Sequence, residues 1–367
     1  MRIVGLTWTV FRLPLRVPFR TATSAFVHRD GILLRLATDA GIVGLGEASP
    51  HPALGPQGVR EALRALERVE ERALGAEAEE LPDIGADIPP ALACALDVAA
   101  CDALAQAQGI SVARLLSADA HEIVPVNATI GAATAAGAAA EAAAARDAGF
   151  QCVKLKVGMA ATPATEAERV AAVRRALGPH IKLRLDANGA WSREQAVSTI
   201  RALASFDLEL VEQPVPANDV EGLACVRAAV RVLIAADEAV TNAEAARRLL
   251  EAGAADILVL KPMVVGGLRP ACRIRELAAA AGAECIVTTT IDSGVGTAAA
   301  LHLAATLPEP ARACGLATRS LLAGDIVRDP PAAHSGQMLL PDRPGLGVEL
   351  DEKLLSQFAI SEGQVMA

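Results

Sequence analysis

The stretch CVKLKVG, residues 152–158, places two lysines in a run that otherwise has the composition of a buried strand. On a strand, residues i and i+2 point to the same face, so Lys154 and Lys156 are expected to lie side by side. A buried lysine is costly unless it is paired with an acid or has a chemical task. The pair therefore predicts a polar functional site, with a snorkelling pair at a strand edge as the alternative.

Short apolar strands alternate with helical segments on both sides of this stretch, which predicts a parallel sheet. Seven or eight such units in a row favour a closed (β/α) barrel over an open sheet. The expected strands cover residues 123–130, 151–157, 181–186, 208–212, 232–237, 256–261, 284–289 and 313–316.

The two ends of the chain have a different pattern. Residues 1–50 contain apolar runs typical of antiparallel strands, and residues 38–41 (TDAG) predict a hairpin turn. Residues 57–74 and 89–107 are expected to be helices. The proline-rich segment after about residue 321 loses the alternating pattern and is expected to return to this first α+β section.

Composition restricts the partners and the location. The net charge is −9, aromatic residues make up 2%, and no lysine- and arginine-rich run occurs, which argues against nucleic acid. No apolar run reaches the length of about 20 residues that spans a bilayer, so no membrane association is expected. The first residues lack a signal-peptide core. The seven cysteines lack CxxC spacing, which favours reduced thiols and a cytoplasmic protein.

A charged residue recurs at the carboxyl end of consecutive strands, every 24 to 26 residues: Asp186, Glu212, Asp237 and Lys261. In a barrel, this end carries the active site. One such acid could simply cap the following helix. Three converging carboxylates, however, repel one another unless a cation lies between them. Because these ligands are all oxygen donors, the pattern predicts Mg²⁺, or Mn²⁺ as a substitute, and argues against zinc.

The lysines of the second and sixth strands are expected to face each other across this metal site. A lysine accepts a proton at neutral pH only when its neutral form is favoured, and a nearby like charge has that effect. Lys154 is therefore expected to assist Lys156, which would carry the proton transfer, with Lys261 on the opposite side.

These motifs resemble those of the enolase superfamily, in particular its muconate-lactonizing-enzyme subgroup. The resemblance rests on KLK (154–156), DAN (186–188), EQP (212–214), ADE (236–238) and LKP (260–262), and it extends to GLGEASP (44–50) near the amino terminus. It implies Asp186, Glu212 and Asp237 as ligands of Mg²⁺, which stabilises an enediolate formed by removing a proton next to a carboxylate. It also implies Lys156 and Lys261 as the two lysines that flank the substrate.

The resemblance also implies the fold class: α/β, a modified (β/α)7β TIM-type barrel with an α+β capping domain. We expect the cap over residues 1–120, completed by about 321–367, and the barrel over residues 121–320. The expected partner is a small-molecule carboxylate substrate, and a homo-oligomer is left open.

Within the subgroup, three stretches resemble o-succinylbenzoate synthases: GLAT (315–318), LKPMVVGGL (260–268) and LRLDANGAW (183–191). Dipeptide epimerases usually carry an Asp-x-Asp after the eighth strand, where this chain has Gly315 and Ala317. The expected activity is therefore a Mg-dependent lyase of menaquinone biosynthesis that removes a proton α to a carboxylate and eliminates water. The alternatives are an N-succinylamino acid racemase or dipeptide epimerase, a muconate cycloisomerase-like enzyme, and a metal-stabilised barrel used only for binding.

Five residues are predicted to bind the substrate. An arginine two residues before the first metal ligand could grip a second carboxylate or form an ion pair inside the barrel, and two residues of TTTIDSGVG (288–296) could offer N–H donors to an anion or cap a helix. His51 is expected to be a surface or cap residue. The candidate substrate-binding residues are Arg184, Ser293, Gly294, Leu316 and Arg20.

Overall fold

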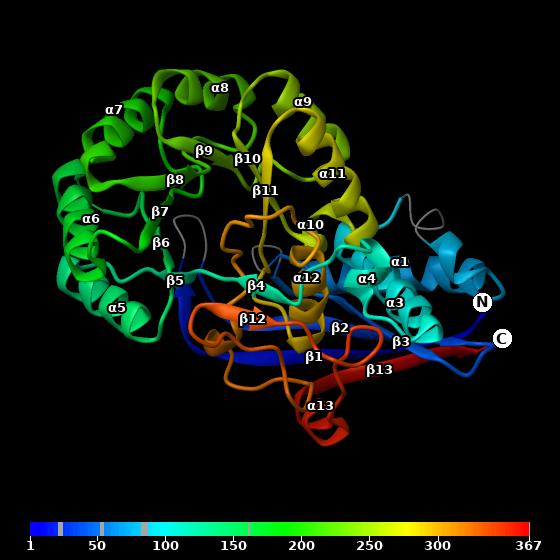
Figure 1. Cartoon of the computed structure of the whole chain (residues 1–367). Coiled ribbons are helices and arrows are strands. Elements are labelled where there is room, and N and C mark those ends of the chain that lie inside the picture. Colours follow the sequence, from blue (N-terminus) through cyan, green and yellow to red (C-terminus); the bar gives the residue numbers. More distant parts are fainter. Residues whose placement is uncertain (21–24, 52–54, 82–86, 161, 367) are drawn as a thin grey trace.

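The computed structural model describes residues 1–20, 25–51, 55–81, 87–160 and 162–366. Its centre is a curled parallel sheet of seven strands in the order β11-β10-β9-β8-β7-β6-β5, with helices along its outer side (Figure 1). The strands are β5 (Ala128–Ile130), β6 (Cys152–Lys156), β7 (Lys182–Asp186), β8 (Leu208–Glu212), β9 (Leu233–Ala236), β10 (Ile257–Leu260) and β11 (Glu284–Val287). This order confirms the predicted succession of βα units.

Helices connect these strands, and side-chain caps close the first turn of several of them. Thr134 accepts a hydrogen bond from Gly137 N at the start of the alanine-rich α5, and Ser192 and Gln195 form a reciprocal capping box on α7. The connecting helices are α5 (Ala135–Asp147), α6 (Pro163–Leu177), α7 (Arg193–Leu203), η3 (Ala204–Phe206), α8 (Val220–Ala229), α9 (Ala243–Glu251), α10 (Pro262–Val265), α11 (Leu268–Ala280) and α12 (Gly294–Ala304).

Two expected strands differ from the prediction. Residues 123–130 form two short strands, because β4 (Ile123–Pro125) leaves the barrel to pair with β12 (Gln337–Leu339) before β5 begins. Residues 313–316 form two isolated parallel bridges, Cys314 with Val126 and Gly315 with Thr288, instead of a full strand. These bridges connect the β11 side of the sheet to the segment before β5.

The cap contains an antiparallel sheet of order β13-β1-β2-β3. Its strands are β1 (Ile3–Arg20), β2 (Ala25–Thr38), β3 (Val43–Ala48) and β13 (Ala359–Met366). The predicted turn at residues 38–41 joins β2 to β3, with Gly41 at φ 73°. The later segment does return, because β13 pairs with β1. The accompanying helices are α1 (Gly55–Ala73), η2 (Ala78–Glu80), α3 (Pro90–Gln108), α4 (Val112–Leu116), η4 (Arg319–Leu321) and α13 (Glu352–Phe358).

The glycines of GLGEASP allow α3 to lie directly on β3. A Cβ atom added at Gly44 would come within 2.0 Å of Ala99 O, and one at Gly46 within 1.9 Å of Ala95 O. Any larger residue would force the helix off the sheet. By length and composition α3 could also cross a membrane, which its sequence pattern did not indicate. Of its most apolar window, 72% is buried, as in the core helix of a folded domain.

His302 of α12 joins the barrel to the cap in the protein core. Its Nδ1 accepts a hydrogen bond from Ala113 N at 3.2 Å, so the ring proton is on Nε2, which donates to Leu346 O at 3.1 Å. Burial lowers the pKa of His302 to about 4. The unfolded chain therefore binds this proton more readily than the folded protein.

The free energy of unfolding should reflect this histidine. The stability that the protein owes to a neutral, buried His302 is fully present above pH 6.5. It decreases as the pH falls towards 4, by up to about 3 kcal/mol. Urea titrations at pH 7 and pH 5 measure the loss. His302→Gln cannot titrate and should lose less stability between these pH values than the wild type, whereas the exposed control His180→Gln should behave like the wild type. An equal loss in all three proteins would contradict this prediction.

Candidate active site

Three acids meet at the carboxyl end of the curled sheet, as the sequence predicts. Asp186 ends β7, Glu212 ends β8 and Asp237 directly follows β9, and all three side chains are buried. One carboxylate oxygen of each lies within 4.8 Å of the others, and no other such group of His, Cys, Asp or Glu occurs among the described residues. Three oxygen donors at this spacing fit a hard divalent cation.

The electrostatics of the trio indicate a site that is short of positive charge. Burial and then the charge of Asp186 raise the pKa of Glu212 to about 8. Burial opposes the ionisation of Asp186, but Lys156 and Lys154 outweigh it and lower the pKa of that carboxyl. Because carboxylates this close resist simultaneous ionisation, a divalent cation would relieve the repulsion.

Three lysines surround the acids, and the predicted side-by-side arrangement of the first two is confirmed. Lys154 Nζ lies 3.0 Å from Glu212 Oε1 and 3.1 Å from Asp186 Oδ2, and Lys156 Nζ lies 2.5 Å from the same Asp186 oxygen. Lys261, directly after β10, lies 2.7 Å from Asp237. Burial acts to lower the pKa of both Lys154 and Lys261, but the neighbouring carboxylates outweigh it and raise the pKa of each.

Residues around these groups hold their positions, and the motifs alone did not assign them a role. Gln213, left-handed at φ 38°, accepts a hydrogen bond from Asp237 N at 2.9 Å and so links β8 to the third acid. Asn188 accepts from Lys156 Nζ at 3.0 Å and donates to Glu238 at 2.8 Å. Both residues belong to the EQP and DAN motifs, and this membership was the only sign in the sequence that they contribute to the site.

A second set of contacts holds the main chain at Lys156 of β6. Arg169 of α6 is buried and donates to Lys156 O at 3.1 Å and to Ala132 O at 2.9 Å, while it also pairs with Glu166. Glu166 accepts from Gly158 N at 2.8 Å. This pair fixes the main chain just after β6. Its spacing looks like an ordinary i,i+3 helix pair, so nothing in the sequence distinguished it.

A cavity of about 160 Å³ opens above the acids and lysines. Its lining also includes apolar side chains and several threonines. The lining residues are Phe26, His51, Thr129, Lys154, Lys156, Asn188, Asp237, Glu238, Lys261, Thr288, Thr289, Thr290, Ile291, Gly315, Thr318 and Leu321. His51 of the cap therefore belongs to the site. Burial and then Lys261 lower its pKa.

Arg184 lies away from this cavity. Its guanidinium is buried beside Glu209, with Nε 2.5 Å from Glu209 Oε2 and Nη1 2.6 Å from Ala313 O. It points inward as predicted but one layer deeper than Asp186, because it stands two residues earlier on β7. The observed contact is the internal ion pair, so we do not retain Arg184 as a substrate ligand.

The N–H groups at the start of α12 are already occupied. Glu47 of the cap accepts from Ser293 N at 3.1 Å and Gly296 N at 2.8 Å, and Asp325 accepts from Gly294 N at 2.9 Å. Ser293 is the N-cap residue of the helix, in agreement with the capping alternative. Carboxylates of this chain therefore occupy the donors that were predicted for a substrate anion at Ser293 and Gly294.

Two further predicted residues do not define the site. Leu316 is fully buried, and its neighbour Gly315 lines the cavity instead. The main chain of Arg20 ends β1 and pairs with Ala25, but its side chain lies outside what the structure describes.

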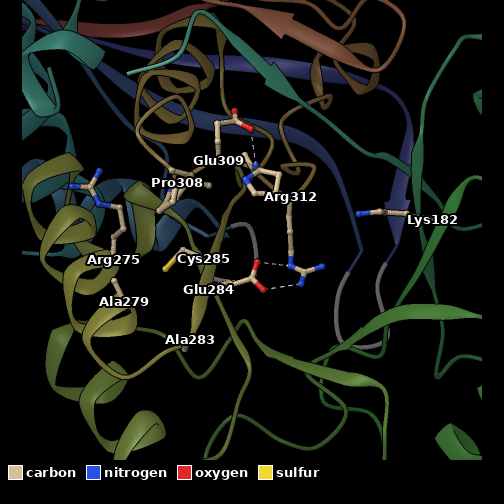
Figure 2. A pocket seen from close by; sticks show the side chains of 12 residues that line it. Lys182, Arg275, Ala279, Ala283, Glu284, Cys285, Pro308, Glu309 and Arg312 are labelled. Carbon is tan, nitrogen blue, oxygen red and sulfur yellow. Dashed lines mark hydrogen bonds and ion pairs between the residues drawn. The ribbon is translucent and has the colours of Figure 1, made fainter. Parts of the chain in front are cut away.

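A larger cavity, of about 460 Å³, is drawn in Figure 2. Lys182 and Glu284, the first residues of β7 and β11, line it, so it lies at the amino-terminal end of these strands. Its charged groups are already paired. Arg312 contacts Glu284 through two hydrogen bonds of 2.7 Å, which Figure 2 draws, and Lys182 lies 3.0 Å from Glu209. The acid trio and the lysines lie elsewhere, so the smaller cavity is the candidate active site.

The chain belongs to the enolase superfamily, in its muconate-lactonizing-enzyme subgroup. Residues 4–117 match the model of the "Mandelate racemase / muconate lactonizing enzyme, N-terminal domain", and residues 137–354 match "Enolase C-terminal domain-like". The family accounts for a cap and a curled parallel sheet with a polar site at the carboxyl ends of its strands. Its members are enzymes that use Mg²⁺.

Relatives with different activities are similarly close. The o-succinylbenzoate synthase of Thermobifida fusca is 36% identical, over 97% of this chain and 92% of that protein. The hydrophobic dipeptide epimerase of Enterococcus faecalis is 31% identical, over 95% and 99%. The crystal structure of the N-succinyl Arg/Lys racemase of Bacillus cereus matches with a TM-score of 0.93 at 26% identity, over 100% of both chains. Overall similarity therefore does not distinguish which of these reactions the enzyme catalyses.

The acid trio should bind one Mg²⁺ ion. Asp186→Asn, Glu212→Gln and Asp237→Asn each remove a charged ligand, so each should weaken binding at least about tenfold in a calorimetric titration. The control Asp207→Asn changes an exposed acid in a left-handed turn that asparagine tolerates, and it should bind like the wild type. Chelation should abolish turnover, and added Mg²⁺ or Mn²⁺ should restore it. Unchanged binding in all three trio variants would refute the assignment.

Proposed function

We propose that this enzyme is an o-succinylbenzoate synthase-like lyase of menaquinone biosynthesis, which removes a proton α to a carboxylate and eliminates water. The observation that carries the proton abstraction in this proposal is the placement of Lys156 and Lys261. They extend from β6 and from the end of β10 into one cavity, on either side of the acid trio carried by β7, β8 and β9. A substrate carboxylate bound at the trio would present its α-carbon between the two amines.

The roles of the chain's own groups follow from this geometry. When Mg²⁺ is bound by Asp186, Glu212 and Asp237, it supplies positive charge that stabilises the substrate carboxylate as the α-proton leaves. Lys156, held by Asn188 and by Arg169 behind its main chain, takes the proton and returns it to the departing hydroxide on the same face. Lys261 contributes fixed positive charge from the other face.

The cavity size supports a small substrate. About 160 Å³ is below the usual range of drug-sized sites, which favours a small substrate. The cavity lining also includes neutral hydroxyls and apolar groups, such as Thr289, Thr318 and Leu321. Such a lining suits a substrate whose distal part carries hydrogen-bond acceptors rather than an ammonium group.

One alternative has specific support. An N-succinylamino acid racemase needs a proton carrier on each face of the α-carbon, and Lys156 and Lys261 stand on opposite sides of the trio. Both activities begin with the same proton abstraction. The two lysines therefore provide the means to separate them.

Substitution of the lysines should affect the two reactions differently. Lys156→Ala should lose essentially all lyase activity, on the order of 10⁴-fold, because one amine serves as base and acid. Lys261→Arg keeps a cation and should retain more lyase activity than racemase activity. Steady-state rates of o-succinylbenzoate formation and of N-succinyl-L-arginine racemisation measure both effects.

Two results would contradict this assignment. If Lys261→Ala loses lyase activity while Lys156→Ala keeps it, the base is the other lysine. If the wild type racemises N-succinylamino acids far faster than it forms o-succinylbenzoate, the racemase alternative is correct.

The surroundings of Gly315 argue against an epimerase of free dipeptides. Thr288 Oγ1 donates to Gly315 O at 2.8 Å. A Cβ atom added at Gly315 would lie 2.5 Å from Thr288 Oγ1 and 2.9 Å from Thr288 Cβ. A β-branched side chain thus fills the space that a carboxylate at position 315 would need. The described residues around this position, Thr288, Gly315 and Thr318, carry no acid that could neutralise a substrate ammonium.

We therefore expect little or no epimerisation of L-Ala-L-Glu. Gly315→Asp alone should lower thermal stability without conferring this activity, because Thr288 blocks the new side chain. The double variant Thr288→Gly with Gly315→Asp should be more stable than Gly315→Asp alone. Efficient turnover of L-Ala-L-Glu by the wild type would contradict the prediction, and proton exchange in D₂O is the assay.

A further inference from the structure

Arg29 of the cap joins two segments that reach the active-site cavity. Its side chain is buried, and its guanidinium donates to Pro50 O at 2.9 Å and Ser49 O at 3.0 Å in the cap. On the barrel side it donates to Ile291 O at 3.0 Å and to Thr290 Oγ1 at 3.3 Å. One planar group thus connects main chain from two domains in a fixed geometry.

The barrel segment that it contacts has a strained main chain. Ile291 has φ 66°, in the left-handed region that β-branched residues rarely adopt. Such a conformation persists only where surrounding contacts impose it, and it occurs often at functional sites. The hydrogen bond from Arg29 Nε to Ile291 O and the one from Thr290 Oγ1 to Asp292 Oδ1, 2.5 Å long, are such contacts.

Both connected segments contribute to one wall of the cavity. Thr290 and Ile291 line it from the barrel, and His51, the residue after Pro50, lines it from the cap. Arg29 itself is not among the lining residues and lies behind them. The guanidinium is not required for the pairing of β2, because Arg29 pairs with Leu13 of β1 through the main chain.

We propose that Arg29 is a positioning residue that holds His51, Thr290 and Ile291 as one substrate-binding wall and keeps Ile291 in its strained conformation. The inference rests on the proposed function only in that the substrate occupies this cavity. Four acceptors on two sides match the planar fork of an arginine, whereas a lysine ammonium has only three donors at a single atom and cannot serve all four acceptors in this geometry.

Arg29→Lys tests the proposal, because it keeps the charge and removes the fork. We expect KM to rise about tenfold or more while kcat changes less than about threefold, since the wall binds substrate and the lysines still perform the proton transfer. Mg²⁺ affinity should stay unchanged. The matched control is Arg12→Lys, an arginine of the same sheet that is bonded to Asp30 at 2.7 and 2.8 Å near the surface.

A double-mutant cycle separates positioning from simple stabilisation. Ile291→Gly removes the conformational strain, whereas Ile291→Val shortens the side chain and keeps it. The effect of Arg29→Lys on KM should therefore fall below about threefold in the glycine background and persist in the valine background. Equal effects in both backgrounds, or a loss of thermal stability with unchanged KM, would overturn the proposal.

An independent measurement remains if the wild type shows neither proposed activity. Amide hydrogen exchange at residues 49–51 and 288–292 should be faster in Arg29→Lys than in Arg12→Lys. Unchanged exchange in these segments would overturn the role of Arg29, while inactivity of the wild type on both substrates would overturn only the proposed function.

Discussion

Three buried carboxylates at one end of a parallel sheet set the main physical constraint on this protein. Asp186, Glu212 and Asp237 lie within 4.8 Å of each other, and this arrangement is tolerated only because positive charge surrounds it. Lys154, Lys156 and Lys261 supply that charge from the neighbouring strands. The parallel register makes the arrangement possible, since Lys156, Asp186 and Glu212 are direct neighbours across β6, β7 and β8. The same ion pairs also hold Lys156 and Lys261 on either side of the acid trio.

The interface between cap and barrel also depends on buried acids whose charge is compensated by nearby donors. Carboxylates of the cap accept hydrogen bonds from the N–H groups at the N-termini of barrel helices. Glu47 of β3 caps α12, and Asp97 of α3 accepts from Leu268 N at 2.6 Å at the start of α11. Helix N-termini carry partial positive charge, so these acids stabilise the interface and satisfy donors that would otherwise be buried without partners. This is why the predicted anion site at Ser293 and Gly294 is filled from within the chain.

The sequence predicts the architecture and the clustering of the acids and lysines well, because both leave periodic signals. Strands recur with an acid or lysine at the same end, and the acid trio and Lys261 were identified from that period alone. Contacts between distant segments leave no such signal. Arg184 shares the inward face with Asp186, but only the structure shows that Glu209 already pairs with it. Arg29, Arg169 and His51 owe their roles to segments that are remote in sequence, so their importance could not be read from local pattern.

The pairing of β13 with β1 affects how the protein is made. Phe11 lies opposite Ala359, so the entire barrel is synthesised between these two partners. Barrel units make contacts between neighbours in sequence and can form as the chain emerges, while the cap sheet must await its last strand. During this interval one edge of β1 has no partner and is a potential site of misassociation. The acids and lysines of the barrel can thus come together before the part of the cavity wall that the cap contributes is complete.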